Sequence, residues 1–210
     1  MKALLFPGQG SQKAGMLNEF ENNFQIVKEI MSRADEALKF DLSKIILNGS
    51  DDDLKKTEIT QPAILITSYA IFSVLKKEFN FDFSKTKYFA GHSLGEYSAL
   101  VCANALNFND ALYLLFERGK SMQEAVPVGE GSMIAILGSK IDEIKDFIKQ
   151  IQTEGVCEIA NDNAEGQTIV SGDVNSINTL SDLLKTNKKK FIPLKVSAPF
   201  HCSLMKPAAI

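Results

Sequence analysis

The sequence predicts an α/β protein with a hydrolase-like core, built on a parallel sheet, and an inserted ferredoxin-like subdomain. Two observations lead to this fold. A short apolar run, a G-x-S-x-G stretch at residues 91–95 and a segment rich in small residues follow one another, as strand, sharp turn and helix do in a nucleophile elbow. After Gly131 the expected elements run β-α-β-β-α-β, the order of a ferredoxin-like unit. We therefore expect a discontinuous core of residues 1–127 and 197–210, with the subdomain at 128–196.

The core is expected to begin with a buried strand and a glycine-rich turn. Residues 3–6 form a short apolar run, and residues 7–12 follow it. Two nucleotide-binding patterns fail here, because a dinucleotide fingerprint needs glycine where Lys13 stands and a phosphate loop needs lysine where Met16 stands. The turn is then either a loop whose backbone approaches another group closely or an ordinary strand-to-helix turn.

Four helices are expected in the rest of the core. Residues 18–40 carry apolar side chains at alternating spacings of four and three, which is typical of a helix with one buried face. Ser50 is expected to cap a short helix, with the aspartates at 51–53 at its positive end, and this interpretation is preferred to a metal site. A long apolar helix starts at Thr60 with proline in its first turn, and an amphipathic helix covers 110–124.

The turn at residues 91–95 predicts a nucleophilic serine. A sharp turn from strand to helix brings the backbone close to Ser93, so a Cβ at Gly91 or Gly95 would clash. The strained turn would push the Ser93 hydroxyl out at the carboxyl end of the sheet. There it lies at a helix N-terminus, where free N–H groups and the helix dipole favour a developing oxyanion.

A serine nucleophile needs a base, and the chain has only two histidines. His92 adjoins Ser93, and consecutive side chains point apart at a tight turn. Elimination leaves His201 as the candidate base. Because the subdomain is inserted between Ser93 and His201, we expect the two residues to meet at a cleft between subdomains. The spacing of the aspartates does not identify one of them as the group that orients the imidazole.

The subdomain is expected from its alternation of apolar runs and amphipathic stretches. Its predicted strands cover 132–137, 156–160, 167–171 and 191–196, and its predicted helices cover 142–152 and 174–184. A turn-rich stretch, 161–166, joins the second and third strands.

Composition narrows the classes of function. Apolar residues are 45% of the 210, enough for a substantial core, and the net charge of −3 gives no electrostatic reason to expect nucleic acid or an anionic membrane. No apolar run reaches the ~20 residues of a membrane span, and the apolar start breaks at Pro7 before a signal peptide could form. The three cysteines, Cys102, Cys157 and Cys202, lack C-x-x-C spacing, which favours a reducing compartment over disulfides or a zinc site.

The expected core has few strands. Only residues 3–6 and 87–90 are predicted as core strands, and a stable open sheet needs more. Residues 204–210 resemble the start of a helix without a cap. We therefore expect further chain beyond Ile210 in the natural protein.

Five stretches together resemble the malonyl-CoA:acyl carrier protein transacylase family. They are residues 6–12 (FPGQGSQ), 60–63 (TQPA), 91–96 (GHSLGE), 118–123 (RGKSMQ) and 198–201 (APFH). They occur in the family's order, and the resemblance covers all 210 residues. Family members are longer and carry a further carboxyl-terminal segment, which supplies sheet strands and the group that orients the histidine.

The resemblance implies roles for residues on both sides of the subdomain. Ser93 matches the acylated nucleophile, and His201 matches its base and acid. The backbone N–H groups of Gln9 and Leu94 would form the oxyanion hole, which gives the first glycine-rich turn a purpose.

The resemblance also implies a substrate pocket. Arg118 would hold the free carboxylate of the malonyl group, whereas from the residues alone an exposed helix arginine is the usual case. Met122 and Phe200 resemble pocket walls, and Phe200 would disfavour branched acyl groups.

The implied function is transfer of malonyl from malonyl-CoA to the phosphopantetheine thiol of acyl carrier protein, for fatty acid biosynthesis. No cofactor or metal is expected, because the thioester is already activated. We expect a cytoplasmic monomer whose partners are acyl carrier protein and malonyl-CoA or coenzyme A, and neither nucleic acid nor membrane. The alternatives are a trans-acting polyketide-synthase-type acyltransferase, a serine hydrolase that shares the elbow, and an inactive fragment or binding module.

Overall fold

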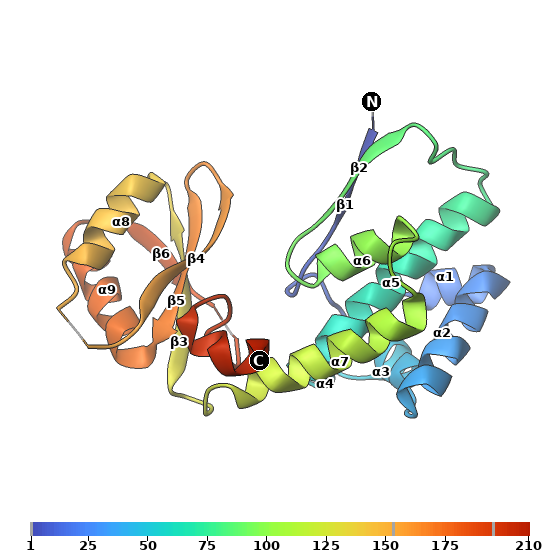
Figure 1. The fold of residues 1–210 in the computed structure, drawn as a ribbon, viewed down its shortest axis with the longest axis horizontal. Helices are drawn as coiled ribbons and strands as arrows, with labels where there is room; N and C mark the ends of the chain where they lie inside the picture. The colour runs from blue at the N-terminus through green and yellow to red at the C-terminus, as the bar shows by residue number, and fades with distance from the viewer. Residues whose placement is uncertain (1, 153, 195) are drawn as a thin grey trace. The chain divides into compact units, whose positions relative to one another are not determined.

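The computed structural model describes residues 2–152, 154–194 and 196–210, and the chain forms two compact units (Figure 1). They are Met1–Lys120 and Ser121–Ile210. The division falls seven residues before the predicted limit of 127, because the last turn of α7 (Phe108–Glu124) belongs to the second unit. Each unit has its own sheet and its own buried clusters.

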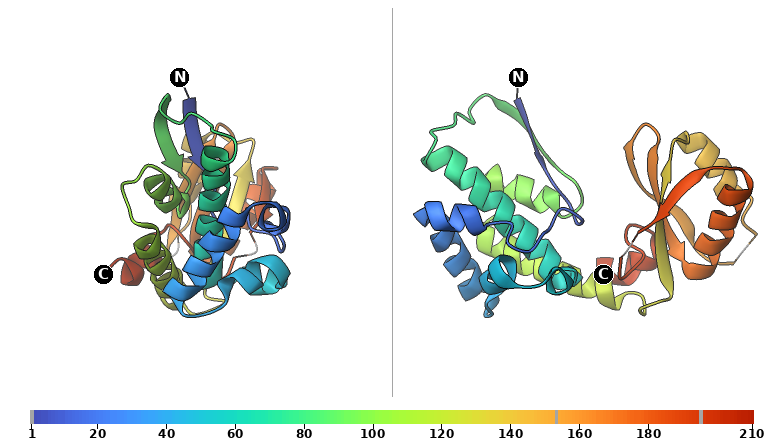
Figure 2. Two further views of the ribbon diagram at one scale, coloured as in Figure 1. Left: turned by 90° about the vertical axis from the view of Figure 1, so that its right-hand side faces the viewer. Right: turned by 180° about the vertical axis from the view of Figure 1, so that it is seen from behind.

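The first unit contains the predicted parallel sheet. Strands β1 (Lys2–Phe6) and β2 (Thr86–Gly91) lie side by side and are parallel, with Phe6 opposite Gly91 (Figures 1 and 2). Parallel strands end at the same edge of a sheet, so the segments that follow Phe6 and Gly91 leave from neighbouring points.

Helices occupy the connection between these strands and the part of the first unit after β2. They are α1 (Asn18–Asn23), α2 (Gln25–Leu38), α3 (Leu42–Asn48), α4 (Asp51–Leu54), α5 (Thr57–Lys77), α6 (Gly95–Cys102) and α7 (Phe108–Glu124). The helical stretch predicted at 18–40 is two helices, because Phe24 has an extended backbone (φ −130°) between them. The predicted buried stripe is confirmed, since α2 buries Val27 and Met31.

Helix α5 begins earlier than predicted. Thr60 is not its first residue, because the backbone N–H groups of Ile59 and Thr60 both donate to the Lys56 carbonyl at 2.8 Å and close a turn before it. Pro62 therefore lies in the second turn. Helix α5 is long and apolar enough to cross a membrane, but 61% of its most apolar window is buried within the protein. We interpret it as the central helix of the first unit's core.

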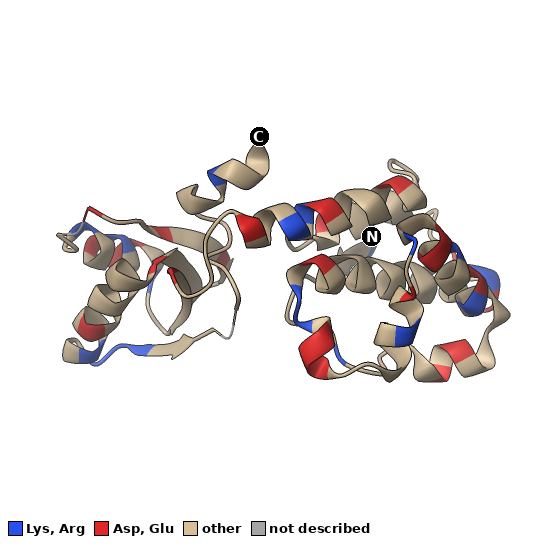
Figure 3. Ribbon diagram, turned by 90° about the horizontal axis from the view of Figure 1, so that it is seen from below, with Lys and Arg blue, Asp and Glu red and all other residues tan. Residues whose placement is uncertain are grey.

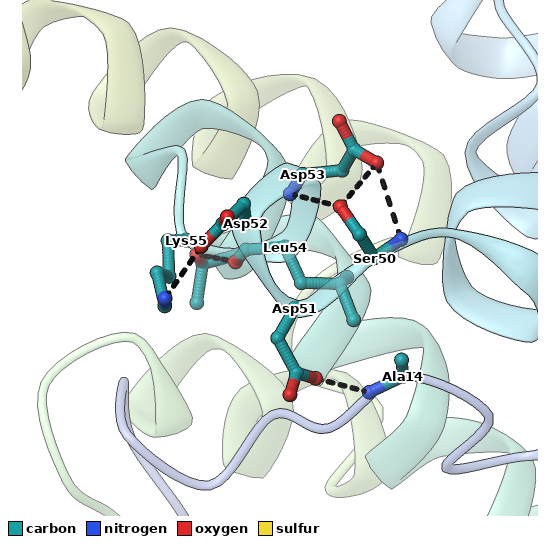
Figure 4. A network of polar contacts seen from close by, with 8 residues as sticks. Ala14, Ser50, Asp51, Asp52, Asp53, Leu54 and Lys55 are labelled. Atoms are coloured by element: carbon teal, nitrogen blue, oxygen red, sulfur yellow. Dashed lines mark hydrogen bonds and ion pairs between the residues drawn. The ribbon is translucent and has the colours of Figure 1, made fainter.

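The predicted cap at Ser50 is confirmed (Figure 4). The Asp53 N–H donates to Ser50 Oγ at 3.1 Å, and the Ser50 N–H donates to Asp53 Oδ2 at 3.1 Å. Asp51 accepts a hydrogen bond from the Ala14 N–H and so ties the start of α4 to the loop after β1. Within the described ranges, these aspartates form no group of metal-ligating side chains.

The second unit has the predicted ferredoxin-like fold. Its elements are β3 (Gly131–Leu137), α8 (Ile141–Lys149), β4 (Cys157–Ala164), β5 (Gln167–Asp173), α9 (Val174–Thr186) and β6 (Lys190–Pro193). The sheet order is β4-β5-β3-β6 and the paired strands are antiparallel. Both helices cover one face of this sheet (Figure 1), where an apolar cluster includes Ile136, Ile144 and Leu180.

Two strands of this unit differ from the predicted ranges by three residues or more at one end. Strand β4 continues to Ala164, through most of the stretch predicted as a turn, because its pairing with β5 absorbs two register shifts. Strand β6 ends at Pro193 rather than at 196, and position 195 of the predicted strand lies outside the described residues.

Residues 197–210 pack within the second unit. Ala198 and Phe200 are buried with Met133 and Ile169 on the sheet face opposite the helices, and a 3₁₀ helix, η1 (Ser203–Ala209), follows. This segment was predicted to belong to the core together with residues 1–127. In the structure it belongs to the second unit, because its apolar side chains are buried on the surface of β3 and β5. The predicted functional division between core and subdomain stays a prediction.

Charged side chains of both signs are interspersed along the helices of each unit (Figure 3). Several form pairs three residues apart, such as Lys55 with Asp52 and Lys145 with Asp142. Such exposed pairs contribute little to stability.

Candidate active site

The G-x-S-x-G stretch forms the predicted elbow between β2 and α6. Strand β2 ends at Gly91, and α6 begins at Gly95. Ser93 between them has a left-handed backbone, with φ +53°. A residue with a Cβ adopts this conformation at a cost, so the surroundings of Ser93 must hold it in place.

The two glycines of the elbow are required by close backbone contacts. A Cβ on Gly91 would overlap the backbone of Gly95 and Glu96, and a Cβ on Gly95 would lie 2.7 Å from the Pro7 carbonyl oxygen and closer still to that of Phe6. Real Cβ atoms do not approach other atoms this closely. The elbow therefore packs directly onto the end of β1.

The glycine-rich turn after β1 lies beside the elbow. The His92 N–H donates to the Phe6 carbonyl at 3.0 Å, and a Cβ on Gly8 would lie 2.6 Å from the His92 carbonyl oxygen. These contacts favour the first of the two interpretations of this turn, a loop whose backbone approaches another group closely. Among the hydrogen bonds of the described residues, none has the Gln9 or Leu94 amide as donor. Their role as an oxyanion hole stays a prediction.

Arg118 lies at the elbow. Its Nη2 donates to Ser93 Oγ at 3.2 Å, its Nη1 donates to Gln61 Oε1, and its guanidinium carbon lies 5.9 Å from the centre of the Tyr97 ring. The side chain is half-buried. Burial lowers the pKa of Arg118 from its ordinary value, and the neighbouring Tyr97 and Glu96 oppose that change. Because arginine starts from so high a pKa, the guanidinium stays charged.

A close helix crossing positions Arg118. A Cβ on Gly119 would lie 2.6 Å from the Thr57 carbonyl oxygen and from the Glu58 Cα, so α7 touches the backbone of α5 at this point. The contact brings Arg118 next to Gln61. Gln61 was not predicted as a site residue, although a sequence signal existed, since it lies in the TQPA stretch at residues 60–63. In the structure this polar side chain has only 1% of its surface exposed.

His201, Met122 and Phe200 lie in the second unit. Met122 and Phe200 are buried in one apolar cluster, and His201 is exposed beside it with a left-handed backbone (φ +60°). His92 is also exposed, in the first unit. The structure thus brings Arg118 to Ser93, and the pairing of Ser93 with His201 stays a prediction.

The cysteines are poor candidates for a nucleophile. All three are free thiols. Burial raises the pKa of Cys102 to about 12, and burial together with the charges of Asp173 and Glu158 raises that of Cys157 to about 12. Burial also raises the pKa of Cys202, although a hydrogen bond with Ser171 opposes it. These thiols are protonated near neutral pH, and a thiol is a much weaker nucleophile than a thiolate.

Comparison with known proteins identifies the family of the chain. The family model of the acyl transferase domain matches residues 3–209. Malonyl CoA-acyl carrier protein transacylases from Bacillus subtilis and Haemophilus influenzae are 46% and 45% identical over 210 and 208 residues, which are 99% of this chain and 65% and 66% of those proteins.

Solved structures give the same result. The malonyl CoA-acyl carrier protein transacylase of Coxiella burnetii superimposes with a TM-score of 0.94 at 43% identity, over 99% of this chain and 65% of that one. A malonyl-transacylase in complex with its type II polyketide synthase acyl carrier protein superimposes with a TM-score of 0.92 at 40% identity, over 99% and 66%.

The chain spans about two thirds of the length of these relatives, 65–66%. Within that span it has their fold, and the family model covers nearly all of its residues. The resemblance found in the five sequence stretches is therefore confirmed, and the chain belongs to the acyl transferase domain family.

Proposed function

We propose that this chain transfers the malonyl group from malonyl-CoA to the phosphopantetheine thiol of acyl carrier protein, through a malonyl ester on Ser93. One observation carries the proposal: the strained serine of the elbow has an arginine guanidinium 3.2 Å from its hydroxyl. A hydroxyl and a cation at neighbouring points match the two ends of a malonyl thioester, a reactive carbonyl and a free carboxylate. The names of the relatives favour the same substrates.

In the first half-reaction, Ser93 Oγ attacks the malonyl carbonyl while His201 accepts its proton. The carbonyl oxygen becomes an oxyanion, which the N–H groups of Gln9 and Leu94 and the N-terminus of α6 would stabilise. The C–S bond then breaks, and His201 returns the proton to the leaving coenzyme A thiolate. The product is the malonyl ester of Ser93.

In the second half-reaction, the phosphopantetheine thiol of acyl carrier protein attacks this ester. His201 accepts the thiol proton and returns it to Ser93 Oγ when the ester bond breaks. Two half-reactions through one covalent intermediate give ping-pong kinetics. We expect no cofactor, because the malonyl thioester that enters the reaction is already activated.

Substrate choice is assigned to Arg118, Met122 and Phe200. A guanidinium binds a carboxylate through two parallel charge-assisted hydrogen bonds, and Gln61 orients Arg118 for this. Met122 and Phe200 would form apolar walls of the acyl pocket, with Phe200 limiting branched groups. We further propose a monomeric cytoplasmic enzyme in fatty acid synthesis.

A second candidate is a trans-acting acyltransferase that serves a polyketide synthase. It is favoured by the similarity to a malonyl-transacylase in complex with a type II polyketide synthase acyl carrier protein. Transfer to the two kinds of carrier protein, measured side by side, distinguishes the candidates.

The test is intact-protein mass spectrometry after brief mixing with malonyl-CoA. We expect one malonyl adduct with the wild type and with Ser32→Ala, an exposed serine on α2. We expect none with Ser93→Ala, and a weak adduct with acetyl-CoA. Folded wild-type protein that forms no adduct would contradict the proposal, as would an adduct that survives Ser93→Ala.

A further inference from the structure

We propose that Glu158 is a positioning residue for His201. The proposal rests on the function proposed above, in which His201 is the base that acts on Ser93. Glu158 lies on β4, and its carboxylate accepts a hydrogen bond from the Ser203 N–H at 2.7 Å. Ser203 follows His201 by two residues and begins η1. The carboxylate therefore holds the chain directly after the imidazole.

The need for an anchor follows from the backbone of His201. Its φ of +60° is in the left-handed region, which a residue with a Cβ rarely adopts. Such a conformation persists where the surrounding structure holds it, and at functional sites it fixes the direction of a side chain. If the loop around His201 relaxed, the imidazole would change direction.

The loop is held on the side before His201 by packing. A Cβ on Gly131 would overlap the ring of Pro199, so this proline lies directly on β3. Ala198 and Phe200 are buried, and the Cys202 thiol donates to the Pro199 carbonyl at 3.1 Å. On the other side of the histidine, the hydrogen bond to Glu158 ties the loop to the sheet.

The position of Glu158 on its strand explains this contact. Glu158 pairs with Ser171 on β5, and Ser171 pairs with Met133 on β3, so the three side chains share one face of the sheet. Met133 belongs to the cluster that buries Phe200, which places that face under residues 197–210. The register shifts of β4 come only after Ile159, so the pairing of Glu158 with Ser171 is regular.

Glu158 and Ser203 are both exposed, so loss of their hydrogen bond should loosen the loop without unfolding the unit. The test compares Glu158→Ala with Glu158→Gln, whose amide oxygen can still accept from the Ser203 N–H. Glu165→Ala is the matched control, because Glu165 is an exposed carboxylate in the β4–β5 turn of the same sheet.

The first measurement is amide hydrogen exchange of the peptide covering residues 198–205. We expect Glu158→Ala to raise its exchange rate about tenfold, with the β5 peptide unchanged, because a local opening becomes easier. Glu158→Gln and Glu165→Ala should exchange like the wild type. This readout does not depend on activity.

The second measurement is the rate of Ser93 acylation by malonyl-CoA in a single turnover. A misdirected base slows the chemical step and leaves substrate binding intact, so Glu158→Ala should lower the maximal acylation rate about tenfold and leave the half-saturating malonyl-CoA concentration unchanged. Glu158→Gln should restore most of the rate. If Glu158 had a purely structural role, Glu158→Ala would not lower the rate while leaving substrate binding intact, and Glu158→Gln would not restore the rate.

Each outcome bears on the proposal. Unchanged exchange in Glu158→Ala would overturn it, because the anchor would not exist. Faster exchange in Glu158→Ala with an unchanged maximal rate of Ser93 acylation would also overturn it, because the loop would not position the base. If His201→Ala keeps the wild-type acylation rate, the proposed function itself fails, whereas the exchange measurement still reports whether the anchor exists.

Discussion

At the scale of single residues, the site depends on backbone positions that accept only glycine. Ser93 can hold its left-handed conformation because the glycines on either side let α6 press against the end of β1. The elbow was therefore predictable from the glycine spacing together with the apolar run before it and the small residues after it, and the role of Ser93 as nucleophile stays a prediction. Spacing could not show which side chains contact Ser93. Arg118 is 25 residues away in the chain and reaches Ser93 because two helices cross.

Gly95→Ala should disrupt this packing. Its new Cβ would meet the carbonyl oxygens of Phe6 and Pro7, so we expect a loss of about 1–3 kcal/mol in the free energy of unfolding and loss of the malonyl adduct. Urea unfolding and intact mass measure the two effects.

The control is Gly129→Ala, because Gly129 has φ +91° and open space around it. It should cost about 1–2 kcal/mol of backbone strain and keep the adduct. Equal adduct formation by both variants would refute the role of Gly95.

Arg118→Ala should narrow the preference for malonyl over acetyl groups. Acetyl-CoA leaves the half-buried guanidinium without a carboxylate, at a cost of about 1–3 kcal/mol, or roughly tenfold to a hundredfold in the ratio of kcat/KM values. Competition between the two thioesters measures the ratio. Arg33→Ala is the control, because Arg33 bonds to Asn109 on the same unit. An unchanged ratio in Arg118→Ala would remove this residue from the site.

At the scale of elements, strands and helices followed from periodicity, while their ends depended on contacts that periodicity does not encode. The extended Phe24 divides one predicted helix, and Lys56 closes the first turn of α5 before Thr60. The ferredoxin-like unit was predicted in full order, because each of its apolar runs is short and separated by turns. Gln61 was missed because its neighbours on α5 indicate only a buried core helix.

The capping box of α4 predicts a pH dependence. Hydrogen bonds from the Ser50 hydroxyl and N–H lower the pKa of Asp53 below its ordinary value. A carboxyl group with a lower pKa when folded contributes stability above its unfolded pKa, and that contribution is lost as pH falls through the lowered value. Asp53→Asn should therefore be less stable than the wild type near neutral pH, and the difference should shrink toward pH 3.

Urea unfolding between pH 7 and 3 measures this change, with Asp162→Asn as the control. Asp162 is an exposed residue on β4 for which no such cap exists among the described contacts. A difference between wild type and Asp53→Asn that stays constant over this pH range would contradict the assignment.

At the scale of the whole molecule, the proposed chemistry is divided between two units. The nucleophile, the guanidinium and the proposed oxyanion donors belong to residues 1–120, and the proposed base and pocket walls belong to residues 121–210. These roles come from the family resemblance, whose motifs are local in the sequence, and they stay predictions. Sequence reasoning could not derive how residues 197–210 are held, since the burial of Phe200 depends on β3 and β5.

The pairing of β1 with β2 has a consequence for the order of folding. Lys2 lies opposite Thr86, so this sheet forms only after a long loop closes, and the loss of chain entropy makes such closure slow. The elbow packs on Phe6, so Ser93 can become reactive only after that closure.

During refolding, the helical signal in circular dichroism should recover before Ser93 can be labelled by a fluorophosphonate. Recovery of both signals in one phase would contradict this order. The pairing of β1 with β2 is thus the step that has to precede completion of the elbow.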